Sequence, residues 1–156
     1  MKEIILVKNG ELVLKGLNRN TFEDILIKNM RKALKQIGEF NFTKSQSTIM
    51  IEPVEENVDM DECTEILSKV FGIAALSRAV VAEKDFEDIK KKTLEYLGER
   101  LGEVETFKVN AKRSDKKFPM KSPEICREIG GLILSKFNSL KVDVHNPELT
   151  VTVEIR

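Results

Sequence analysis

Residues 20–52 read NTFEDILIKNMRKALKQIGEFNFTKSQSTIMIE, and this stretch decides the fold because a helical pattern is followed at once by two strands. Asn20 and Glu23 have the spacing of a capping box, and apolar residues then recur every three or four positions. Residues 40–43 and 48–52 alternate apolar and polar side chains across a short polar connection. This alternation predicts a β-hairpin.

Further strands and a helix are predicted on both sides of this stretch. Residues 3–7 are rich in β-branched side chains and predict a first strand. After the hairpin, Asp59 or Asp61 can cap a second helix, and residues 73–82 predict a last strand that runs on as a connection. The order strand, helix, strand, strand, helix, strand is that of a ferredoxin-like domain, with two helices on one face of a four-stranded antiparallel sheet. We place this domain at residues 1–76.

The second half of the chain, residues 77–156, predicts a separate α/β domain. A helix capped by Asp85 precedes a strand at residues 106–111. A second helix follows a basic loop, with Ser122 as its cap and Pro123 at its first helical position. The chain as a whole is therefore expected to be of the α+β class.

Two more strands are expected near the end of the chain, at residues 142–144 and 149–155. The helix before them contains Gly130 and Gly131, which cost about 1 kcal/mol each relative to Ala. The pair therefore indicates close approach of the helix backbone to the sheet or to a ligand. Because the sequence stops within a strand, we expect it to be part of a longer polypeptide, truncated at the C-terminal end of its second domain.

Charge is segregated along a chain whose net charge is zero. Residues 52–65 hold seven acidic residues and no Lys or Arg, whereas residues 108–122 hold six cations and one acid. A local cluster of cations attracts and holds a polyanion even when the whole protein is neutral. The basic segment therefore predicts a polyanionic partner, with RNA as the expected class.

Cysteine content and hydropathy argue against several other classes. Cys63 and Cys126 are far apart and belong to no Cys-x-x-Cys pair, so no metal site or redox motif is expected. His145 has no nucleophile or carboxylate at a catalytic spacing. No stretch approaches the roughly 20 apolar residues that a membrane span needs, and the chain opens on a strand rather than a leader peptide. We expect a cytoplasmic protein.

Three fragments carry a resemblance to a known family: GELVLKGLNRNTFE at residues 10–23, VFGI at residues 70–73, and FKVNAKRSDKKF at residues 107–118. The first resembles the N-terminal signature of the tRNA 4-thiouridine synthetases, which are sulfurtransferases also linked to thiamine thiazole biosynthesis. The second resembles that family's domain junction. The third, together with residues 122–130 and 141–144, resembles its THUMP domain.

The resemblance implies that a ferredoxin-like domain and a THUMP domain present the acceptor stem and 3′ end of a tRNA to a C-terminal adenylating domain. In the family, that domain thiolates a uridine at the tRNA elbow with ATP and a sulfur donor supplied by a cysteine desulfurase, and homodimers are common. These 156 residues contain neither the family's ATP loop nor its catalytic cysteine. We therefore expect no catalytic residue and no cofactor in this chain, and no activity from it alone.

The candidate RNA-binding residues form two groups. The first surrounds a predicted helix entrance, where N–H groups attract phosphate, and it includes an arginine for forked donation and a phenylalanine for a sugar or base. It comprises Lys112, Arg113, Lys116, Lys117, Phe118, Lys121 and Ser122. The second precedes the first long helix and comprises Lys15, Asn18 and Arg19. Each has a structural alternative, a solvated charged face for the first and a capped turn for the second.

Two other functions stay open at this point. A free-standing THUMP protein could assist another RNA-modifying enzyme in trans, and the acidic residues 52–65 could instead form a protein-interaction surface. A downstream ATP-binding domain in the gene would argue against the first alternative. Binding of acceptor-stem RNA would argue against the second.

Overall fold

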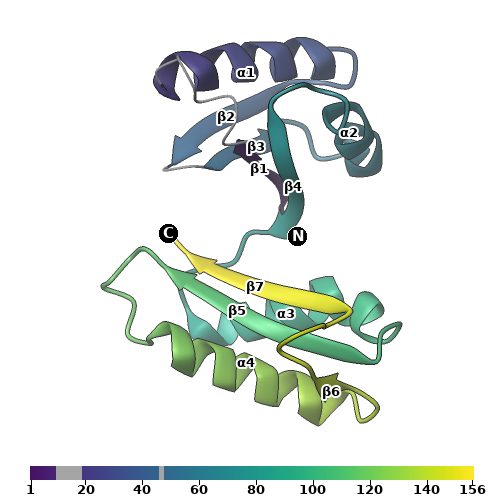
Figure 1. The fold of residues 1–156 in the computed structure, drawn as a ribbon, viewed down its shortest axis with the longest axis vertical. Coiled ribbons are helices and arrows are strands. Elements are labelled where there is room, and N and C mark those ends of the chain that lie inside the picture. Colours follow the sequence, from purple (N-terminus) through teal and green to yellow (C-terminus); the bar gives the residue numbers. More distant parts are fainter. Residues whose placement is uncertain (10–18, 46–47) are drawn as a thin grey trace. The chain divides into compact units, whose positions relative to one another are not determined.

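The computed structural model describes residues 1–9, 19–45 and 48–156. The chain forms two compact units, Met1–Val81 and Ala82–Arg156 (Figure 1). Each unit has its own hydrophobic core.

Unit 1 contains a four-stranded antiparallel sheet with the order β2-β3-β1-β4. Its strands are β1 (Glu3–Asn9), β2 (Phe40–Ser45), β3 (Thr48–Pro53) and β4 (Ile73–Val80). In the centre of the sheet, Ile5 of β1 lies opposite Ile51 of β3 and Arg78 of β4. The predicted hairpin and the ferredoxin-like arrangement are both confirmed.

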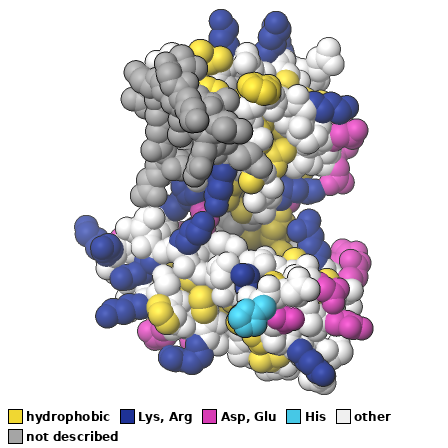
Figure 2. Space-filling view, in the orientation of Figure 1, with side chains coloured by type: hydrophobic (Ala, Val, Ile, Leu, Met, Phe, Trp, Pro, Cys, Tyr) yellow, Lys and Arg dark blue, Asp and Glu magenta, His cyan; other side chains and the backbone are white. Residues whose placement is uncertain are grey.

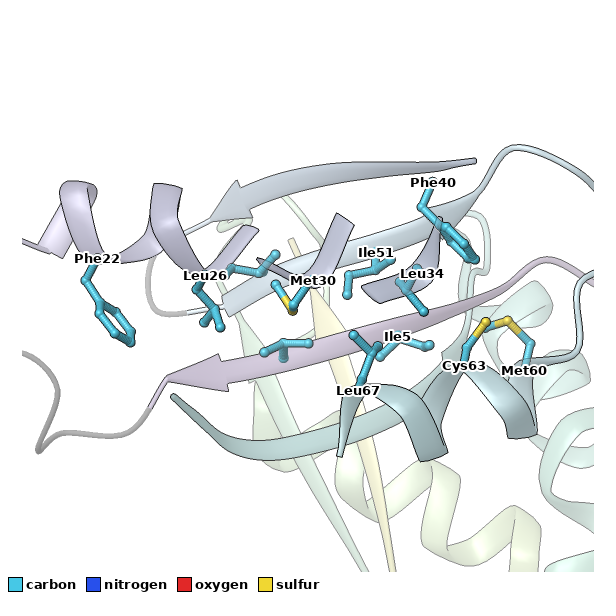
Figure 3. Packing of buried hydrophobic residues seen from close by; sticks show 12 residues of the cluster. Ile5, Phe22, Leu26, Met30, Leu34, Phe40, Ile51, Met60, Cys63 and Leu67 are labelled. Atoms are coloured by element: carbon cyan, nitrogen blue, oxygen red, sulfur yellow. The ribbon is translucent and has the colours of Figure 1, made fainter. Parts of the chain in front are cut away.

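Two helices, α1 (Arg19–Leu34) and α2 (Met60–Leu67), cover one face of this sheet (Figure 1). Phe22, Leu26, Met30 and Leu34 follow one another at helical spacing along α1 and point into the core (Figure 3). A fully buried side chain of this size stabilises the fold by roughly 1.5–3 kcal/mol. The apolar periodicity read from the sequence therefore corresponds to the buried face of α1.

The helix starts of unit 1 agree only partly with the sequence. Asp59 is the cap of α2, because its Oδ1 accepts a hydrogen bond from the Glu62 N–H at 3.1 Å. The capping box at Asn20 is wrong, because α1 already begins at Arg19 and Asn20 lies within its first turn.

Unit 2 contains a three-stranded parallel sheet with the order β6-β5-β7. Its elements are α3 (Phe86–Leu101), β5 (Thr106–Arg113), α4 (Ser122–Lys136), β6 (Lys141–Val142) and β7 (Leu149–Ile155). Strand β5 is longer than predicted, because Lys112 and Arg113 pair with Glu154 and Ile155 of β7. Strand β6 is shorter than predicted and ends at Val142.

Both helices of unit 2 pack on the same face of its sheet. Phe107 and alternate residues after it on β5 lie in a core with the Ile125, Ile129 and Ile133 side chains of α4. Because side chains alternate along a strand, Lys108 and Lys112 project from the opposite face, which no helix of unit 2 covers.

The helix starts of unit 2 also differ from the predictions. Lys121, in extended conformation, is the cap of α4, so Ser122 is its first helical residue rather than its cap. Asp85 does occupy the cap position of α3 but makes no capping hydrogen bond. Instead, the carboxylate of Asp88 accepts the Glu83 N–H at 2.7 Å, which draws the chain before the helix back onto its first turn.

Candidate nucleic-acid interface

The basic residues of unit 2 are displayed by the loop that joins β5 to α4. At the start of this loop, the N–H groups of Ser114 and Asp115 both donate to the carbonyl oxygen of Ile155, at 2.7 and 3.2 Å. Further on, the Phe118 N–H donates to the Asp115 carbonyl at 3.3 Å. These bonds tie the loop backbone to the end of β7 and close a tight turn.

Arg113 adds a side-chain attachment from the end of β5. Its Nη1 donates to the carbonyl oxygens of Lys116, at 3.2 Å, and Phe118, at 2.9 Å. The guanidinium is thus turned inward onto the loop backbone. Both bonds start from Nη1 and end on carbonyl groups of the protein, whereas the sequence predicts forked donation to RNA.

Asp115, the single acid of the basic segment, is also used within the loop. Its carboxylate accepts the Lys117 N–H at 3.0 Å and the Lys84 ammonium at 2.8 Å. The Lys84 hydrogen bond, and then that of the Lys117 N–H, hold the pKa of Asp115 below its usual value. Asp115 therefore stays ionised and paired at neutral pH. Lys84 is a member of this site that no local sequence pattern indicates, because only tertiary contact brings it to the loop.

Phe118 does not have the predicted role. Its side chain is only 5% exposed and belongs to the core of unit 2. A ring buried in the core cannot stack on a base. Phe118 instead anchors the loop to the core of unit 2. The hydrophobic effect explains this placement, since the apolar ring gains more from the core than from solvent.

The lysines of the loop remain on the surface. Lys116, Lys117 and Lys121 are exposed, and none of them forms an ion pair within unit 2, which is described throughout. Figure 2 shows Lys and Arg side chains gathered where the β5–α4 loop lies in Figure 1. Lys112 is exposed too, but it projects from the open sheet face beside Glu154. The loop lysines thus form one group, with Lys112 adjoining it on another face.

The start of α4 adds backbone N–H groups to the same region. Ser122 is half-buried, and Lys121 provides no side-chain cap, so the first amide groups of the helix have no side-chain partner from the cap. Such amide groups favour a phosphate. The carboxylate of Glu124 in the first turn partly offsets this positive potential.

The structure does not show whether the second predicted group, Lys15, Asn18 and Arg19, forms a site. Lys15 and Asn18 lie outside the described residues, and Arg19 is the first residue of α1.

A groove runs between α4 and the exposed edge of β5, and none of its lining residues belongs to the β5–α4 loop. Strand β7 lies along one edge of β5, and the short β6 lies along the other. Because β6 ends after two residues, this second edge of β5 has no strand of unit 2 beside it beyond Phe107. The resulting space, about 570 Å³, has apolar walls that include the exposed Leu134, Val142 and Val144, and its lining includes the cations Lys108 and Arg127. Neither cation forms an ion pair within unit 2.

Gly130 and Gly131 also line this groove. A Cβ added at Gly130 would lie at 4.0 Å from Val109 Cγ2, which is ordinary contact, and one added at Gly131 would meet no atom within 4 Å. Close approach to the sheet therefore does not require either glycine. Approach of a ligand, the other predicted reason, stays a prediction.

Other chemistries find little support in the part of the chain that the structure describes. No group of His, Cys, Asp and Glu side chains there could hold a metal ion, and no helix there is long and apolar enough to cross a membrane. Burial, followed by the nearby carboxylates of Asp59 and Glu62, raises the pKa of Cys63 to about 11, so this thiol is unreactive at neutral pH. His145 lies in an exposed turn.

Two protein-family models match the chain. One describes the ThiI ferredoxin-like domain and matches residues 4–77, and the other describes the THUMP domain and matches residues 83–156. The chain therefore belongs to the class of proteins that carry a ferredoxin-like domain of the ThiI type followed by a THUMP domain.

More particularly, the chain is similar to the N-terminal part of tRNA sulfurtransferases. It is 48% identical to a probable tRNA sulfurtransferase of Acetivibrio thermocellus and 44% identical to one of Alkaliphilus metalliredigens. In both comparisons the match covers 100% of this chain and 40% of the relative. The resemblance noted in the sequence is thereby confirmed.

Two solved structures agree with this assignment. A crystal structure of a 4-thiouridine synthetase in complex with RNA and bound ATP has a TM-score of 0.80 and 35% identity, covering 100% of this chain and 39% of that one. The crystal structure of PH1313 from Pyrococcus horikoshii Ot3 has a TM-score of 0.81 and 28% identity, covering 99% of this chain and 51% of that one.

Proposed function

We propose that this chain is the tRNA-binding part of a tRNA 4-thiouridine synthetase. It holds the acceptor stem and 3′ end of a tRNA, so that a further domain of the whole protein thiolates a uridine at the tRNA elbow. The names of the relatives and the RNA in the 4-thiouridine synthetase structure support this proposal. The observation that carries it is the β5–α4 loop, whose backbone is held by the protein while three exposed lysines have no ion pair within unit 2.

The positive charge of this loop suits the surface that RNA presents to a protein. A-form RNA presents phosphates, hydroxyl groups and unpaired ends to a protein, because its major groove is too deep and narrow to enter. Lys116, Lys117 and Lys121 suit phosphates as point charges, and the first amide groups of α4 add a second kind of donor. Recognition is therefore mainly of shape and backbone, with weak readout of sequence.

The groove along α4 fits the unpaired 3′ nucleotides of the acceptor end. Its apolar walls suit bases and sugars, while Arg127 of α4 suits the phosphates between them. The same helix serves both sites, since α4 begins at the basic loop and its residues from Cys126 to Leu134 border the groove. Under this proposal a paired stem lies on the loop, and its single-stranded end follows α4 to the groove.

The whole protein works in the cytoplasm under this proposal, with ATP and a cysteine desulfurase as the sulfur source, and as a homodimer. The alternative of a THUMP protein acting in trans has weaker support, because the similarity to sulfurtransferases covers this entire chain, including its ferredoxin-like domain.

Salt dependence of RNA binding tests the proposal. The double variant Lys116→Gln, Lys117→Gln should weaken binding of an acceptor-stem RNA and lower the slope of log K against log salt by roughly 1.4–1.8, because each lost phosphate contact removes about 0.7–0.9. The control variant Lys91→Gln, Lys136→Gln removes the same charge from exposed positions elsewhere in unit 2. Equal slopes for both double variants would refute the assignment of the loop.

A further inference from the structure

The β5–α4 loop contains two kinds of charged residue with opposite orientations. Lys116, Lys117 and Lys121 are exposed and without ion pairs in unit 2, whereas Arg113 and Asp115 are half-buried and directed at the loop itself. The sequence does not separate them, since all five lie within one basic segment. Their contacts do.

Arg113 donates hydrogen bonds to the part of the loop backbone that has few other contacts. Between Asp115 and the buried Phe118, the backbone passes through two exposed lysines, and a chain segment with exposed side chains on a surface has few packing contacts to fix it. The Arg113 guanidinium bonds the carbonyls of Lys116 and Phe118, one in this segment and one at its end. It thus fixes the directions in which the two lysines leave the backbone.

We propose that Arg113 is a positioning residue of the RNA surface: it holds the β5–α4 loop so that Lys116, Lys117 and Lys121 face the RNA, and it makes no phosphate contact of its own. This inference rests on the proposed function. Asp115 assists from the other side, because its carboxylate holds the Lys117 N–H and is itself held by Lys84. The loop is thereby ordered before RNA arrives, which removes an ordering cost from binding.

The proposal and direct phosphate contact lead to different salt dependences. If Arg113 positions the loop, Arg113→Gln and Arg113→Lys both weaken binding of an acceptor-stem RNA about threefold to tenfold, the scale of ordering one or two side chains. In both variants the slope against salt stays that of the unaltered chain. The matched variant Lys117→Gln lowers the slope by roughly 0.7–0.9, because it removes a phosphate contact.

Amide hydrogen exchange of the free protein supplies a second readout that needs no RNA. The Lys117 and Phe118 amides, which bond to Asp115, should exchange faster in Arg113→Gln, while the amides of β5 and α4 keep their protection and show that unit 2 is still folded. Addition of RNA should restore the loop protection.

Two results would overturn the proposal. One is an Arg113→Gln variant whose salt slope falls as far as that of Lys117→Gln. The other is unchanged exchange of the loop amides in that variant. If the unaltered chain bound no RNA at all, the proposed function would fail, and the exchange measurement would still show whether Arg113 orders the loop.

Discussion

Gly72 shows how a single residue can hold a turn that no other residue fits. It lies between α2 and β4 with φ of +100°, a conformation that L side chains rarely adopt. A Cβ at this position would lie 2.8 Å from Cζ of Phe22, whose ring is buried in the core of unit 1. Both the backbone and the neighbouring ring therefore require glycine.

Replacing Gly72 with Ala should lower the free energy of unfolding by roughly 2–3 kcal/mol, combining the cost of a left-handed conformation with displacement of the Phe22 ring. Urea denaturation of the whole chain measures the change. Gly38→Ala is the matched control, because its Cβ would lie at 3.8 Å from Val58 Cγ2 in ordinary contact. Equal losses for the two variants would contradict this account.

At the scale of an element, α4 combines an apolar face with two glycines that its packing does not need. Ile125, Ile129 and Ile133 bury one side of the helix, and Gly130 and Gly131 border the groove on another. Helix propensity favours Ala, Leu and other good helix formers over glycine at position 131, where a Cβ would meet no atom within 4 Å. If the groove binds the unpaired 3′ nucleotides as proposed, stability and ligand binding make opposite demands at this position.

Gly131→Leu should raise the free energy of unfolding by about 0.5–1 kcal/mol through helix propensity. It should also weaken binding of an acceptor-stem RNA with an unpaired 3′ end, because the new side chain occupies the groove. A blunt duplex of the same stem is the control ligand, and its affinity should not change. Equal affinity of the variant and the unaltered chain for the overhanging RNA would show that nucleotides do not enter the groove.

At the scale of the whole molecule, charge is segregated in a chain of zero net charge. The acids of α2 and the segment before it belong to unit 1, and Asp61 there pairs with Arg78 of β4, as does Glu3. The basic loop belongs to unit 2. Because solvent screens exposed charges beyond roughly 8–10 Å, a charged cluster acts mainly on its immediate surroundings. The net charge of the chain therefore does not describe the proposed RNA surface.

A minihelix that keeps only the acceptor stem and its 3′ end should bind within about threefold of whole tRNA, since the proposed contacts involve the acceptor end alone. Fluorescence anisotropy of labelled RNA measures both affinities at one salt concentration. A hairpin of equal length without an unpaired 3′ end is the control and should bind more weakly. Failure of the minihelix to bind would mean that other parts of the tRNA carry the interaction.

Much of the fold follows from local patterns. The apolar spacing of α1, the alternation of β2 and β3, and the cap at Asp59 are properties of neighbouring residues, so they are visible in the sequence. Errors arise at the helix caps Asn20 and Ser122, where the local pattern places the helix start one or more residues late, and at strand ends, where pairing partners are distant. The end of β5 depends on Glu154 and Ile155, and the short β6 on contact with the start of β5, so neither boundary could be set from local propensity.

The sequence by itself determined the order of elements, the two α/β domains and the presence of a basic segment, because apolar periodicity and charge are written along the chain. Only the tertiary structure decided what each charged or aromatic residue of that segment does. Phe118 enters the core, Arg113 turns onto loop carbonyls, and Lys84 arrives from another element to pair with Asp115. These roles depend on which atoms surround each side chain in space, and that is set by packing.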